Sequence, residues 1–143
     1  MSRIFWDSNI FIYLLEDYGP DSDRVAAMRE RMLERGDQLI TSAFTIGEVT
    51  VKARREGRPD LCQQYEDAFV ENAQIIPFDI QTARLYSEIR SHRTRNIRPA
   101  DAIQIACAAI ADTDLFVTND KKLHQLSVPG IHFITSVERA PIY

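Results

Sequence analysis

Residues 97–120 read IRPADAIQIACAAIADTDLFVTND, and this stretch decides the fold. Pro99 suits the first turn of a helix, and residues 103–111 are almost all apolar, so the helix should be buried on most of its surface. The apolar run 115–118 follows closely and predicts a strand. A buried helix leading directly into a strand is typical of α/β proteins, in which helices cover a parallel sheet.

The rest of the chain repeats this alternation of short apolar runs and amphipathic segments. Strands are predicted at 4–6, 38–41, 74–78, 115–118 and 131–135. Helices are predicted over 8–16, 22–36, 61–73, 80–90 and 121–126, with two more beginning after Ser42 and at Pro99. We therefore expect one domain over residues 1–143, a three-layer α/β/α sandwich around a central, mostly parallel sheet of about five strands.

Composition restricts the class of protein. The 17 basic and 21 acidic residues give a net charge of −4, which argues against a nonspecific nucleic-acid binder. No apolar run is long enough to cross a bilayer and no signal peptide is evident, so we expect a cytoplasmic protein without membrane contact. Cys62 and Cys107 form no CxxC pattern, and the three histidines show no ligand spacing. Any bound metal would have to be held by oxygen.

Four acids are predicted to meet at one edge of the sheet. Asp7 follows the first strand and Asp120 follows the fourth. Asp101 lies at the start of a helix that should run antiparallel to the strands, and Glu48 lies about two turns into the helix after the second strand. In open α/β sheets, ligands bind outside the carboxyl ends of the strands. The sequence therefore places these four carboxylates at the ligand-binding edge.

Each acid also has an ordinary explanation. Asp7 and Asp120 could cap helices, Asp101 could be favoured by the helix dipole, and Glu48 could be partly solvated. Together, however, four converging carboxylates would repel one another and raise each other's pKa. No lysine or arginine is the sequence neighbour of Asp7, Glu48 or Asp101. A divalent cation would remove this repulsion, and carboxylate oxygens favour Mg²⁺ or Mn²⁺.

Three segments, WDSNIFIYLLE at 6–16, TSAFTIGEV at 41–49 and the opening stretch at 97–120, occur in the order and spacing of one family. Over nearly its whole length the chain resembles the PIN-domain nucleases, and within them the VapC-like toxins of prokaryotic toxin–antitoxin systems. The resemblance implies a catalytic, metal-binding set of Asp7, Glu48, Asp101 and Asp120, with Asp7 and Asp101 as direct ligands of Mg²⁺ or Mn²⁺. It also implies that three further residues orient this set: Asn9, Thr118 and Asn119.

The resemblance implies a function as well. Such a protein would be a toxin that cleaves single-stranded or looped RNA by a metal-activated water, without a covalent intermediate. A cognate antitoxin would inhibit it, often by placing an arginine in the acidic pocket, and the toxin would form a homodimer. Possible contact surfaces are residues 28–36 and the tail 137–143.

Two basic segments flank the acids in sequence, and both are candidates for RNA binding. They comprise Lys52, Arg54 and Arg55 after Glu48, and Arg93, Arg95 and Arg98 before Asp101. Such residues could hold phosphates beside the acidic pocket, but they could equally be solvated or pair with an acidic partner.

Other functions remain to be weighed. The main alternative is a noncatalytic RNA- or protein-binding module with the same fold. A receiver domain would need a second acid beside Asp7 and a lysine after the last strand. A phosphatase of the aspartyl-phosphate type would need D-x-D where this chain has Asp7-Ser8-Asn9. Both of these fit poorly.

Overall fold

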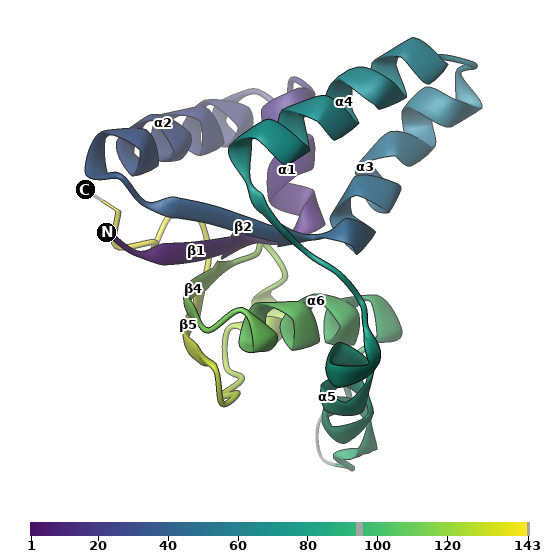
Figure 1. Ribbon diagram of the computed structural model, residues 1–143. Coiled ribbons are helices and arrows are strands. Elements are labelled where there is room, and N and C mark those ends of the chain that lie inside the picture. Colours follow the sequence, from purple (N-terminus) through teal and green to yellow (C-terminus); the bar gives the residue numbers. More distant parts are fainter. Residues whose placement is uncertain (94–95, 143) are drawn as a thin grey trace.

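The computed structural model describes residues 1–93 and 96–142. The described residues form one sheet of five parallel strands in the order β3-β2-β1-β4-β5 (Figure 1). The strands are β1 (Arg3–Trp6), β2 (Gln38–Ser42), β3 (Gln74–Ile76), β4 (Thr113–Val117) and β5 (Ile131–Thr135). The predicted fold class and the predicted number of strands are thus confirmed.

Helices cover both faces of this sheet, as expected for parallel strands. They are α1 (Ser8–Leu15), α2 (Pro20–Arg35), α3 (Ala43–Arg55), α4 (Pro59–Asn72), α5 (Ile80–Ser91) and α6 (Pro99–Ile110), with the short 3₁₀ helix η1 (Lys121–Leu123). In Figure 1, α1 to α4 lie above the sheet and α5 and α6 lie below it. Among the described residues, no helix is both long and apolar enough to span a membrane.

Alternation along the strands divides the apolar residues between two cores. In β1, Ile4 and Trp6 face α1 to α4, whereas Phe5 faces α6 on the other side. Phe5 stacks on Phe116 of β4 with ring centroids 5.2 Å apart. Helix α6 is buried along most of its length. Its small alanine side chains allow it to pack closely against the sheet.

Two predicted elements are shorter than the sequence suggested. The strand predicted at 74–78 ends at Ile76, since Pro77 has no N–H to donate to a ladder. The helix predicted at 121–126 is a 3₁₀ turn over Lys121–Leu123, in which Leu123 is the only buried residue. A segment with so little buried surface has no tertiary packing to support a longer helix.

The topology places the carboxyl ends of all five strands at one edge. Trp6 pairs with Val117, and the Asp7 amide donates to the Val117 carbonyl at 3.0 Å. Asp7 and Thr118, which are distant in sequence, therefore leave adjacent strands together. Helices α1, α3 and α6 begin at this same edge (Figure 1).

Gly130 is the glycine whose replacement should disturb the fold most. Its φ is +95°, and an added Cβ would lie 2.5 Å from the Ala109 carbonyl oxygen at the end of α6. Gly57 has a similar φ of +67° but open space around it. We expect Gly130→Ala to lower the free energy of unfolding by more than about 2 kcal/mol and Gly57→Ala by only about 1 kcal/mol. Urea denaturation measures both; equal losses would show that the close approach to Ala109 is unimportant.

Candidate functional site

Asp7 is the buried carboxylate of the carboxyl edge. Asp7 is 6% exposed. It forms the N-cap of α1, since its Oδ1 accepts a hydrogen bond from the Ser8 amide at 2.8 Å. Its other oxygen, Oδ2, accepts from the Thr118 hydroxyl at 2.8 Å. Capping is therefore a real role of Asp7, but capping does not require the burial that the structure shows.

Glu48 reaches the same place from α3. Its Oε1 accepts a hydrogen bond from the Ser8 hydroxyl at 2.5 Å. Ser8 thus joins Asp7, through its amide, to Glu48, through its side chain. The prediction that Glu48 extends back towards the strand ends agrees with this contact.

Asp101 and Asp120 form a second pair, and an arginine lies between them. The Arg98 Nε is 3.4 Å from Asp101 Oδ2, and its Nη2 is 3.3 Å from Asp120 Oδ2. The sequence argument considered only immediate neighbours and so missed this cation, which lies one helical turn before Asp101. Asp120 also caps η1 by accepting from the Lys122 amide at 3.0 Å.

The two acids at the centre of the edge are nevertheless incompletely compensated. Burial raises the pKa of Asp7, and the charge of Asp101 adds to this rise, although hydrogen bonds from Thr118 and Ser8 oppose it. Burial also raises the pKa of Asp101; Arg98 opposes the rise and Asp120 adds to it. Both carboxylates remain harder to ionise than in water, so a further positive charge at this edge would be favourable.

Gln104 is a site residue that the sequence analysis did not identify. It lies on α6, one turn after Asp101, and is 1% exposed. Its Nε2 lies 3.3 Å from Asp7 Oδ1, 2.9 Å from Ser8 Oγ and 2.8 Å from Thr45 Oγ1. The Ser42 hydroxyl donates to its Oε1. The sequence does contain one signal for Gln104, because it is the single amide side chain within the apolar run 103–111.

The three residues expected to orient the acids lie at the same edge. Thr118 donates to Asp7 and accepts from the Asp120 amide at 3.2 Å, so it connects the two acidic pairs. The Asn119 amide donates to Asn9 Oδ1 at 3.4 Å, a long bond. Asn9 therefore contacts the β4 end rather than an acid directly.

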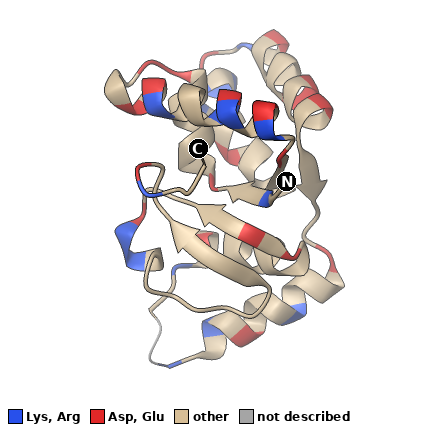
Figure 2. Ribbon diagram, turned by 90° about the vertical axis from the view of Figure 1, so that its left-hand side faces the viewer, with Lys and Arg blue, Asp and Glu red and all other residues tan. Residues whose placement is uncertain are grey.

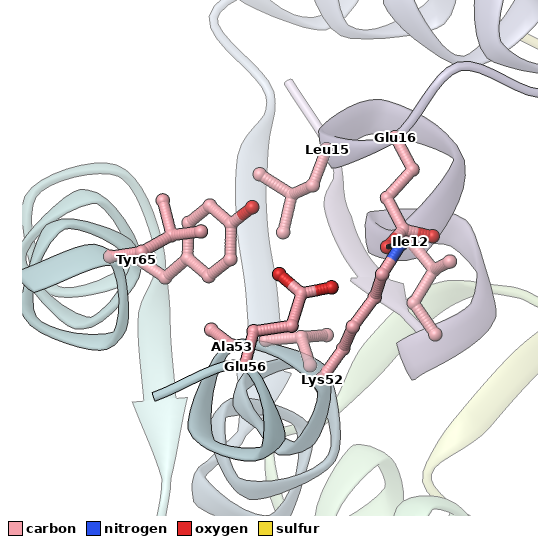
Figure 3. A pocket seen from close by; sticks show the side chains of 9 residues that line it. Ile12, Leu15, Glu16, Lys52, Ala53, Glu56 and Tyr65 are labelled. Atoms are coloured by element: carbon pink, nitrogen blue, oxygen red, sulfur yellow. Dashed lines mark hydrogen bonds and ion pairs between the residues drawn. The ribbon is translucent and has the colours of Figure 1, made fainter. Parts of the chain in front are cut away.

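The predicted RNA-binding residues are scattered. Lys52 forms an ion pair with Glu16 at 2.9 Å, and Figure 3 shows it pointing towards Glu16 in a pocket between α1, α3 and α4. Arg54 and Arg55 are exposed in the last turn of α3, about 18 Å along the helix from its start. Arg93 is exposed after α5, and Arg95 lies outside the described residues. Among the described members of this group, only Arg98 contacts the acids.

The donor set at this edge is suited to a hard cation. Within residues 1–93 and 96–142, no three His, Cys, Asp or Glu side chains form a ready metal cluster. Hydrogen bonds through Ser8 link Asp7 to Glu48, ion pairs through Arg98 link Asp101 to Asp120, and the charge of Asp101 acts on Asp7. A single pocket shared by all four acids stays a prediction. Their carboxylate oxygens and the raised pKa of Asp7 and Asp101 nevertheless fit Mg²⁺ or Mn²⁺.

Solved structures with a similar fold include several VapBC proteins and one described as a toxin–antitoxin complex. The chain is similar to one chain of VapBC2 from Rickettsia felis bound to promoter DNA, with a TM-score of 0.72, 18% identity and coverage of 94% of this chain and 98% of that one. For DNA-bound VapBC from Salmonella typhimurium, the TM-score is 0.71 and the identity 21%, covering 96% and 99%. For FitAcB from Neisseria gonorrhoeae, the TM-score is 0.67 and the identity 23%, covering 83% and 88%.

Sequence comparison identifies the family itself. No functionally curated protein matches the chain. The family described as "PIN domain", however, matches residues 4–129. This range contains all four acids and every strand except β5, apart from Arg3 at the start of β1. With this match over most of its length, the chain belongs to the PIN-domain family.

Proposed function

We propose that this protein is a metal-dependent endoribonuclease that acts as the toxin of a toxin–antitoxin pair in the cytoplasm. The observation that carries the proposal is the pair Asp7 and Asp101, two carboxylates at the sheet edge whose pKa burial raises. Perturbed carboxylates gathered at the carboxyl edge of a parallel sheet are typical of active sites.

The acids would hold Mg²⁺ or Mn²⁺, with Asp7 and Asp101 as direct ligands and Glu48 or Asp120 acting through water. A bound ion of this kind would supply a nucleophilic water at neutral pH and stabilise charge on the phosphodiester. Each Asp7 oxygen already accepts hydrogen bonds from protein donors, and each retains lone-pair capacity for a further contact.

The chain's own residues would position these carboxylates. Thr118, Ser8 and Gln104 hold Asp7 from three different elements, so its side chain has little freedom to rotate. Arg98 would keep Asp101 and Asp120 together before the cation binds. Preorganised ligands of this kind lower the reorganisation needed for catalysis.

A protein partner forms part of the proposal. The Rickettsia and Salmonella structures similar to this chain are VapBC complexes, and others are described as toxin–antitoxin complexes. We propose a cognate antitoxin for this chain as well, and a homodimer. The contacts of Arg98 demonstrate that Asp101 and Asp120 can accept a guanidinium, so an antitoxin arginine could bind the same two carboxylates.

A noncatalytic module that binds RNA or protein is the second candidate. The hydrogen bonds that Asp7 and Glu48 make with Ser8 would serve a purely structural role equally well. The two candidates differ in their response to Asp101→Asn. An enzyme loses RNA cleavage while still binding RNA, whereas a binding module has no cleavage to lose.

Removing either central acid should abolish cleavage. We expect Asp7→Ala and Asp101→Ala to reduce Mn²⁺-dependent cleavage of total RNA at least about 100-fold, because the cation loses a ligand. Expression of either variant should no longer arrest growth. Asp67→Ala, an exposed acid of α4, is the matched control and should cleave normally.

Purified wild-type protein and variants are compared with Mn²⁺, with Mg²⁺ and with EDTA, after circular dichroism has verified folding. Sequencing RNA 5′ ends after brief expression then gives the cleavage site. Cleavage by Asp101→Ala at the wild-type rate, or by the wild type in EDTA, would disprove the proposed mechanism.

The raised pKa of Asp101 predicts how stability depends on pH. The folded state binds the proton of the Asp101 carboxyl group more tightly than the unfolded chain does. The stability that comes from this proton is therefore present at acid pH and is lost as pH rises through the raised pKa. In EDTA at pH 7, the free energy of unfolding of Asp101→Asn should equal that of the wild type or be higher by less than about 1 kcal/mol. The difference should vanish near pH 3. Thermal melts across this range measure it. A large loss of stability at pH 7 would favour the helix-dipole role instead.

Gln104 should act as a positioning residue. Gln104→Met removes the amide near Asp7, Ser8 and Thr45, which should cost about 1–3 kcal/mol of unfolding free energy and lower cleavage. Losing a donor to the carboxylate also raises the pKa of Asp7 further, so the acid limb of the pH–rate profile should move to higher pH. Gln63→Met, on the exposed face of α4, is the control. An unmoved acid limb would limit Gln104 to a structural role.

A further inference from the structure

A cleft adjoins the acidic edge on the β5 side. It is a cleft of about 600 Å³ between α2, η1 and the tail that follows β5. In Figure 2, η1 lies next to this tail segment. Asn119 lines the cleft and lies between Thr118 and Asp120, so the cleft begins where the acidic site ends.

Two cations of this cleft are available to a ligand. Among the described residues, neither the Lys121 ammonium nor the Arg139 guanidinium has a hydrogen-bond or ion-pair partner. A third cation, Arg24, is already paired with Asp21 and Glu138, each at 3.2 Å, and joins α2 to the tail. The acids of the cleft are thus engaged by Arg24, while Lys121 and Arg139 are left to attract an anion.

Two rings complete the lining of the cleft. The Tyr13 hydroxyl accepts from Asn119 Nδ2 at 2.5 Å, and its ring packs edge-on against Tyr18 with centroids 5.5 Å apart. The His124 Nε2 lies 2.9 Å from the Thr118 carbonyl. Both rings are therefore fixed by residues of the acidic edge. Single-stranded RNA is bound by this combination of aromatic surfaces and phosphate-binding cations.

We infer that this cleft is a nucleotide subsite, which holds the RNA nucleotide next to the scissile phosphate. Lys121 and Arg139 contact its phosphate, and its base stacks on Tyr13 or His124. This inference rests on the proposed ribonuclease function and specifies where that activity would bind its substrate. It differs from the sequence expectation, which placed RNA contacts on α3 and on the segment before α6.

The test uses Lys121→Gln/Arg139→Gln, with Arg58→Gln/Arg84→Gln as a control that removes the same charge from exposed positions just before α4 and on α5. Binding of a fluorescent single-stranded RNA is measured by anisotropy in EDTA at several salt concentrations. The cleft variant should bind about tenfold more weakly, and the slope of log affinity against log salt should fall by about 1.4, the value for two lost phosphate contacts. The control should bind like the wild type.

Tyr13 supplies a second readout. Tyr13→Phe keeps the ring and should keep RNA affinity, whereas Tyr13→Leu should lose about fivefold or more if a base stacks there. Equal weakening by the cleft and control pairs, or undiminished binding by the cleft pair, would overturn the inference. Unchanged RNA binding with lost binding of a co-expressed partner protein would assign the cleft to that partner. Failure of the wild type to bind and cleave RNA would instead refute the proposed function.

Discussion

The carboxylate of Asp7, buried where β1 ends, is the constraint on which the rest of this edge depends. An ionised group in such a place costs several kcal/mol unless other groups compensate it. Ser8, Thr118 and Gln104 provide that compensation from α1, the end of β4 and α6. The edge is therefore a polar network enclosed between two apolar cores, and Asp7 is its common member.

Parallel topology explains why so much of this could be predicted from sequence. In a parallel sheet, a residue directly after any strand lies at the same edge, so a position in the chain becomes a position in space. Asp7 and Asp120 each follow a strand, and the structure places both there. The apolar run of α6 was equally informative, since a helix buried on most faces has few possible locations in a domain of this size.

Side-chain partners could not be predicted in the same way, because they depend on how each helix is rotated and on residues far away in the chain. Lys52 was expected near RNA, but Glu16 of α1 lies within its reach and pairs with it. Gln104 resembled an irregularity in an apolar helix until the structure placed four hydroxyl and carboxylate groups around it. Arg98 precedes Asp101 by three residues, a spacing whose geometry is defined only once α6 begins at Pro99.

Arg98 supplies part of the positive charge that Asp101 and Asp120 require. Its side chain is 71% exposed, and its contacts with Asp101 and Asp120 are 3.4 and 3.3 Å long, so each ion pair is weak. It carries one charge and faces only one of the two acidic pairs, which leaves Asp7 dependent on neutral donors. A small ion of charge two could approach both pairs and would interact with them more strongly than a solvated guanidinium. Arg98 therefore compensates only part of the negative charge at this edge, and the raised pKa of Asp7 and Asp101 favours a further, divalent cation.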